Sequence, residues 1–184
     1  MRKERHHPSL CAAALALALV LPRAGAHADP SAPFHGVWEA CQSGKGEPAC
    51  HYFILEQKEE RICGLWHYSA DARDFEGRLI AETQGLSGRV TYNCGTPGAE
   101  TSIACSGQAV PFAPSEWMKT DRPLLICDGR IFELGARDRS CADIGKSAGL
   151  PKLSSFTQPI SGRDREWMNA CLNDPTYPPP KLRR

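Results

Sequence analysis

Residues 124–134 read LLICDGRIFEL, and this stretch decides how the rest of the chain is interpreted. Two largely apolar runs, 124–127 and 130–134, flank the dipeptide Asp128-Gly129. Asp-Gly between such runs favours a two-residue turn with positive φ at both positions, which joins neighbouring antiparallel strands. The stretch therefore predicts a β-hairpin.

Further segments with strand character precede this hairpin. Residues 51–57 (HYFILEQ) and 61–69 (RICGLWHYS) are separated by the charged residues 58–60, which suits a second hairpin. Other strand candidates are residues 36–41, 77–83, 89–93 and 101–105. In 61–69, alternation places these residues on one face: Ile62, Gly64, Trp66 and Tyr68. About eight short strands without a helical period predict an all-β fold, a small antiparallel β-barrel or sandwich.

The character of the chain changes after residue 134. Residues 135–160 show little periodicity, apart from a turn of helix expected at 140–146. Ser161 then has the character of an N-cap, and a short C-terminal helix is expected over 163–172. We therefore divide the mature chain into a β-barrel domain with an irregular extension (29–160), a helical segment (161–174) and a Pro-rich tail (175–184).

Trp167 and Cys171 are four residues apart in the expected helix, so they share one face. We expect this face to hold the helix against the barrel.

The first 28 residues have the pattern of a removable signal peptide. Cationic residues open the chain, and the apolar run 10–21 is too short to span a bilayer. Ala26-His27-Ala28 is a small-x-small site of the kind that signal peptidase cleaves. The sequence therefore predicts a periplasmic or secreted protein.

Eight cysteines remain after that cleavage, because Cys11 lies in the apolar run. An even number in an exported chain predicts a disulfide framework. The eight are Cys41, Cys50, Cys63, Cys94, Cys105, Cys127, Cys141 and Cys171. The expected pairs are Cys41–Cys50, Cys94–Cys105, Cys63–Cys127 and Cys141–Cys171. The spacing of a structural zinc site is absent, so we expect neither a metal nor a cofactor.

Charge gives no sign of a polyanionic partner. The residues after Ala28 hold 18 Lys and Arg against 20 Asp and Glu, since the signal segment removes four of the 22 cationic and one of the 21 anionic side chains. A nearly neutral domain has no field that would attract nucleic acid. No second apolar run approaches membrane length, so we expect no membrane span after signal cleavage.

Gly36-Val37-Trp38 resembles the Gly-x-Trp signature of lipocalins and their calycin relatives. The resemblance implies a barrel in which Trp38 plugs one end and the open end holds a small apolar ligand. It also implies an arginine packed on that tryptophan, a place that Arg130 fits loosely. The family's Thr-Asp-Tyr motif is absent. Periplasmic inhibitors of proteases and lysozymes are also small β-barrels, and an ordinary core strand can carry the same three residues.

Four aromatic residues are our candidates for ligand binding. They are Trp38, Tyr52, Trp66 and Tyr68. A barrel of about eight strands either fills with side chains or holds one small ligand. These residues could therefore line a cavity or complete a core.

Ser87, Gly88 and Tyr92 form a second candidate site. They resemble the Ser-Gly loops with a nearby tyrosine by which periplasmic lysozyme inhibitors plug an active-site cleft. This resemblance implies a partner-binding loop, and an ordinary surface hairpin turn is the alternative.

Catalytic residues are not expected. The chain has no Gly-x-Ser-x-Gly motif, and full pairing of the cysteines leaves no thiolate. His51 and His67 lie on adjacent expected strands, with Glu56 or Asp71 nearby, but no nucleophile accompanies them.

The carboxylates at 71, 74 and 76 offer oxygen ligands for Ca²⁺, but they lack the spacing of an EF-hand loop. We interpret them as a solvated loop.

The first hypothesis is therefore an exported, non-enzymatic binding protein that holds a small apolar ligand or inhibits an envelope enzyme such as a lysozyme or protease. The second is a structural or assembly component of the bacterial envelope that docks through its Pro-rich tail or through the loop around Trp117. The third is a small hydrolase in which His51 or His67 meets two carboxylates in one pocket.

Overall fold

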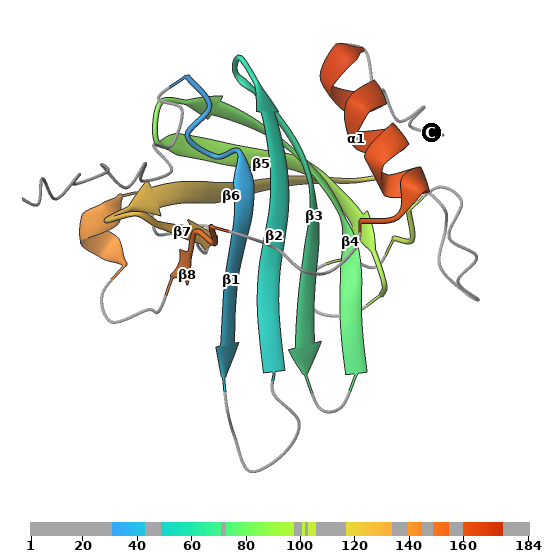
Figure 1. Cartoon of the computed structure of the whole chain (residues 1–184), viewed down its shortest axis with the longest axis horizontal. Helices are drawn as coiled ribbons and strands as arrows, with labels where there is room; N and C mark the ends of the chain where they lie inside the picture. The colour runs from blue at the N-terminus through green and yellow to red at the C-terminus, as the bar shows by residue number, and fades with distance from the viewer. Residues whose placement is uncertain are drawn as a thin grey trace, which may run out of the picture.

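The computed structural model describes residues 31–42, 49–70, 73–97, 101, 103–105, 117–133, 140–144, 149–154 and 160–174. Its eight strands form one antiparallel sheet in sequence order, which curves into a nearly closed barrel (Figure 1). The expected fold class, a small antiparallel β-barrel with four disulfides and a short C-terminal helix, is confirmed. The predicted signal peptide, Asp71 and the Pro-rich tail lie outside the described residues.

The strands follow one another as a meander. Their bounds are β1 Gly36–Gln42, β2 Ala49–Lys58, β3 Arg61–Ala70, β4 Arg73–Gln84, β5 Ser87–Gly95, β6 Met118–Cys127, β7 Arg130–Glu133 and β8 Leu150–Pro151. A 3₁₀ helix, η1 (Cys141–Asp143), and an α-helix, α1 (Gly162–Asn173), complete the fold. The strand expected over 101–105 is wrong for its described residues, which hold only an isolated bridge at Ala104.

The Asp-Gly hairpin is confirmed. Asp128 and Gly129 have φ values of 49° and 71°, and they join β6 to β7 as neighbouring antiparallel strands. The charged tip at 58–60 likewise joins β2 to β3, with Glu59 at φ 54°. The turn chemistry read from the sequence thus sets the register of both pairs.

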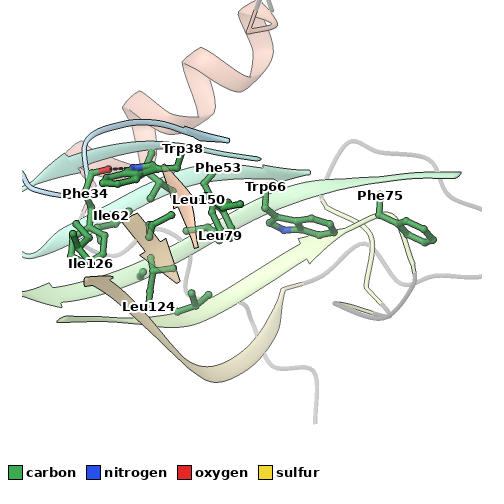
Figure 2. Close-up of a cluster of buried hydrophobic side chains, with 14 residues drawn as sticks. Phe34, Trp38, Phe53, Ile62, Trp66, Phe75, Leu79, Leu124, Ile126 and Leu150 are labelled. Atoms are coloured by element: carbon green, nitrogen blue, oxygen red, sulfur yellow. Dashed lines mark hydrogen bonds between the residues drawn. The ribbon is translucent and has the colours of Figure 1, made fainter. Parts of the chain in front are cut away.

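One end of the barrel is closed around Trp38. The Trp38 indole Nε1 donates to the carbonyl oxygen of Phe34 at 3.0 Å, as Figure 2 shows. Lys152 bridges to Trp38 from just beyond β8, and its ammonium lies 5.3 Å from the Trp38 ring centroid. Gly36 has a φ of 127°, and a Cβ there would lie 2.6 Å from Lys152 Cε. Only glycine fits this contact without strain.

Lys152 thus packs on the tryptophan in the place for which Arg130 was expected. Arg130 instead donates from Nη1 to the carbonyl oxygen of Gly149 at 2.9 Å. The expected packing of Arg130 on Trp38 is therefore wrong.

Alternation along the strands fills the barrel interior. The expected face of β3 is confirmed for Ile62, Trp66 and Tyr68, which pack in or against one apolar cluster. The cluster consists of Phe34, Trp38, Phe53, Leu55, Ile62, Trp66, Phe75, Leu79, Ala81, Val90, Leu124, Ile126, Ile131 and Leu150. Each of these side chains is at most 9% exposed, so most of the interior is a packed core rather than a deep cavity.

A β-bulge in β5 changes which of its side chains face the barrel interior. The register shifts between Val90 and Tyr92, opposite Ile80 and Ala81 of β4. Val90 therefore packs in the interior with Ala81, whereas Tyr92 and Cys94 join an outer cluster with Ile80. One extra residue is enough for this reversal because the side-chain period of a strand is two.

The outer face of β2–β4 carries α1. The helix begins after Ser161, whose Oγ accepts a hydrogen bond from the Asp164 backbone N–H at 3.1 Å, so the expected N-cap is confirmed. Trp167, Met168 and Cys171 form its buried face. This outer layer also holds Trp117, Cys63, Ile80, Cys94 and Cys105.

Two of the four expected disulfides are confirmed, namely Cys41–Cys50 and Cys94–Cys105. The pairs Cys63–Cys127 and Cys141–Cys171 are wrong, since the structure joins Cys63 to Cys171 and Cys127 to Cys141. Cys63 faces outward on β3, directly beneath α1, whereas Cys127 packs with Ile144 near η1. Four disulfides are consistent with export to an oxidising compartment. In the described part of the chain, no helix is long and apolar enough to cross a membrane.

The Cys63–Cys171 bridge spans 108 residues and fixes α1 to the barrel. Replacing both cysteines with alanine is expected to lower the free energy of unfolding, measured with guanidinium chloride. The matched control removes Cys41 and Cys50, which are only 9 residues apart. Loop-closure entropy predicts that removing Cys63–Cys171 lowers the free energy of unfolding by about 2 kcal/mol more than removing Cys41–Cys50 does. An equal or smaller loss would show that α1 does not depend on this bridge.

Candidate functional site

The four aromatic ligand candidates do not share one surface. Trp38 is 2% exposed and packs between Phe34 and Lys152. Trp66 and Tyr68 lie on the inner face of β3. Tyr52 pairs across the strands with His67 on the outer face, where the two rings stack at 4.6 Å. Only Trp66 and Tyr68 are therefore brought together.

These two residues belong to a larger aromatic wall, which we define as His51, Trp66, Tyr68 and Phe75. The Tyr68 and Phe75 rings stack at 4.8 Å with an interplanar angle of 10°, and Trp66 lies 6.1 Å from Tyr68. His51 meets Tyr68 edge to face at 6.4 Å. Phe75 was not foreseen as a site residue, and His51 was considered only for a catalytic role, although the register of β2 and β4 against β3 places both opposite Tyr68.

The residues of the aromatic wall differ in solvent exposure. Trp66 and Phe75 are buried, at 4% and 8%, whereas His51 and Tyr68 are half-buried. Figure 2 shows Trp66 and Phe75 set apart from the dense group around Trp38 and Phe34. The Arg73 guanidinium lies 5.5 Å from the Phe75 ring centroid. The wall thus begins in the packed core and reaches partly accessible rings at the end of the barrel opposite Trp38.

Trp66 is held in place by two glycines. Gly77 and Gly95 pair across β4 and β5, and a Cβ at either position would lie 2.4–2.5 Å from Trp66 Cζ2. The indole therefore lies directly on the backbone of two strands. Trp66 Nε1 is buried and has no hydrogen-bond partner within the described part of the chain.

The inner face also carries polar groups that sequence reasoning missed. Arg122 and Glu133 form an ion pair at 3.1 Å, with side chains 25% and 16% exposed. Both face inward, because Arg122 lies opposite Val90 and Glu133 opposite Leu124. Asn93 is fully buried opposite Leu79. No residue spacing in the sequence signals this pair, because it depends on the register of β5, β6 and β7.

A polar cluster on the outer face combines a serine, an aspartate and a histidine. Ser69 Oγ donates to Asp74 Oδ1 at 2.7 Å, and His67 Nε2 lies 3.4 Å from the same oxygen. A serine nucleophile needs the histidine between serine and aspartate, so that the imidazole can accept the hydroxyl proton. Here the aspartate stands in the middle, and Ser69 is not activated in this way.

The two histidines of the hydrolase hypothesis face opposite sides of the sheet. His51 packs on the inner face with Phe53 and Tyr68, whereas His67 lies on the outer face. Glu56 Oε2 lies 2.9 Å from His35 Nδ1. His51 and His67 therefore do not converge on one pocket.

The structure separates the partner-loop candidates. Ser87 and Gly88 line a hollow of about 470 Å³ at the β4–β5 hairpin, with Glu82, Arg89, Pro123 and Leu125. Tyr92 lies further along β5 and packs against the outer cluster beneath α1.

Trp117 and the candidate ligands for Ca²⁺ lie outside the aromatic wall. Trp117 is 8% exposed and stacks on Trp167 at 5.7 Å, so it belongs to the packing beneath α1. Asp74 interacts with Ser69 and His67, and Glu76 follows it on the exposed side of β4. Among the described residues, Glu39, Cys41 and Cys50 come close enough to share an ion, but the two sulfur atoms are bonded to each other.

Comparison of the chain with family models, with curated proteins and with solved structures finds no match.

Burial raises the pKa of the Tyr52 phenol above its usual value of 10.0, and the carboxylates of Glu76, Glu39 and Asp74 add to the rise. The fold thus favours the neutral phenol. In the unfolded chain the phenol ionises first as the pH increases, so its contribution to stability is complete below about pH 10 and is lost as the pH rises through the folded pKa.

We expect the free energy of unfolding of the wild type to fall more steeply between about pH 9 and about pH 11 than that of Tyr52→Phe, because the variant lacks this ionisation. Urea unfolding at a series of pH values measures the difference. The tyrosinate absorbance of the folded wild type should show one late-titrating group that the variant lacks. Parallel stability curves for the two proteins would contradict the environment described for Tyr52.

Proposed function

We propose that this protein is an exported, non-enzymatic binding protein that holds a small apolar ligand against the aromatic wall. The observation that carries the proposal is the row of stacked rings on the inner face, which ends in the half-buried His51 and Tyr68. Aromatic faces supply large apolar contact area at low conformational cost. Binding sites for small molecules commonly lie at the mouths of β-barrels.

The packed interior limits where such a ligand binds. Phe34, Leu55 and Leu124 are fully buried and fill the half of the barrel near Trp38. An eight-stranded barrel is just wide enough for this filling. The proposed ligand is therefore small and binds at the mouth, next to Tyr68, rather than deep in a calyx.

Protein binding is a second candidate, and a different surface favours it. Leu86 is 57% exposed at the β4–β5 turn, beside the hollow lined by Ser87 and Gly88. An exposed leucine beside a hollow of about 470 Å³ offers apolar contact area to a protein partner such as an envelope lysozyme or protease. Native mass spectrometry distinguishes the two candidates. A complex with such an enzyme, without bound small molecules, would favour the hairpin over the aromatic wall.

Tyr68→Ala should weaken binding of the neutral fluorescent probe N-phenyl-1-naphthylamine at least about ten-fold, equivalent to about 1.4 kcal/mol. The reason is the loss of an accessible ring from the aromatic wall. Tyr52→Ala is the matched control, because it removes a tyrosine from the adjacent strand but from the outer face. Fluorescence titration measures both affinities. Equal losses of probe affinity in the two variants, or no probe binding by the wild type, would contradict the proposal.

A further inference from the structure

We infer that the ligand of the aromatic wall is a planar, uncharged molecule that carries a hydrogen-bond acceptor and accepts the indole N–H of Trp66. This inference rests on the proposed function, because it names the chemical class that the same wall would bind. It predicts weaker binding of a plain hydrocarbon, or of a ligand whose polar groups only donate, than of a ligand of the same shape that carries an acceptor.

The first observation is that the buried indole N–H of Trp66 has no hydrogen-bond acceptor in the described part of the chain. Trp66 is 4% exposed, and its Nε1 has no acceptor among the described residues. Trp38, equally deep in the same cluster, donates its indole N–H to Phe34. Buried polar groups are nearly always paired in native proteins, so an orphan beside a candidate site points to a partner that binds there.

The second observation is that Trp66 cannot readily rotate to find an acceptor in the protein. Its N-bearing edge lies on Gly77, since a Cβ there would be 2.6 Å from Cε2, the carbon bonded to the nitrogen. Gly95 supports the same edge, and Tyr68 stacks beside the indole. The direction of the N–H is thus fixed by packing, as a preorganised binding group requires.

The third observation concerns charge. An indole N–H only donates, so its partner must accept. On the inner face, Arg122 and Glu133 are paired with each other, and the exposed Arg73 guanidinium lies over the Phe75 ring. A charged ligand would lose more of its hydration free energy against the apolar rings than a neutral carbonyl or ether does. An aryl ketone, ester or quinone has both the planar face and the acceptor.

Trp167 provides an internal control. Its Nε1 is also buried without a partner in the described part of the chain, and it is 5% exposed. It lies on α1, in the outer layer, where Trp117 stacks on it and the Arg78 guanidinium lies 5.2 Å from its ring centroid. Removing this donor leaves the inner face unchanged.

The test uses two probes of nearly equal shape, 2-acetylnaphthalene and 2-ethylnaphthalene, which differ in the carbonyl oxygen. The full mature protein should bind the ketone roughly ten-fold more tightly than the hydrocarbon. Trp66→Phe should abolish this preference, because phenylalanine keeps an aromatic ring and lacks the donor. Trp167→Phe should retain it. The ratio of the two affinities separates the loss of the hydrogen bond from the change in ring size.

A second measurement requires no variant. The Trp66 indole N–H resonance of the ¹⁵N-labelled wild type should move downfield with the ketone and not with the hydrocarbon. Equal affinities for both probes, or a preference retained by Trp66→Phe, would overturn this inference while leaving the proposed function standing. Binding of neither probe would remove both.

Discussion

The contact of Trp66 with the Gly77–Gly95 pair is the constraint on which the candidate site depends. An indole that lies directly on two adjacent strands needs both positions to lack a Cβ. The contact packs one side chain of β3 on the paired strands β4 and β5. It also sets the direction of the indole N–H and the level at which Tyr68 and Phe75 stack. Without it, the aromatic wall would lose its inner end.

The same strands serve two layers because their side chains alternate. On β3, Trp66 and Tyr68 point into the barrel, whereas Cys63 points outward and is bonded to Cys171 of α1. The helix therefore supports the sheet from behind the wall. Arg78 adds to this support, since its guanidinium donates two hydrogen bonds to Asp164 and faces the Trp167 ring. A rigid outer layer is what a preorganised binding surface on the inner face requires.

Local patterns in the sequence predicted the local structure. Asp128-Gly129, the alternation on β3 and the Ser161 cap each depend on a few neighbouring residues. Features set by long-range register were not predictable in the same way, namely the Cys63–Cys171 bridge, the closure by Lys152 and the bulge that turns Tyr92 outward. Tyr52 was grouped with Trp66 by residue type, although alternation with the buried Phe53 already indicates the opposite face.

The most direct measurement of the central claim is the effect of Gly77→Ala on Trp66. A new Cβ there would lie 2.0 Å from the Cys94 carbonyl oxygen and 2.5 Å from Trp66 Cζ2, so both the strand pairing and the indole must shift. The Trp66 N–H resonance should therefore shift, and the affinity for N-phenyl-1-naphthylamine should fall at least about ten-fold. Gly162→Ala, at a position with open space around its Cβ, should change neither. An unchanged Trp66 resonance and unchanged probe affinity in a folded Gly77→Ala protein would contradict the account.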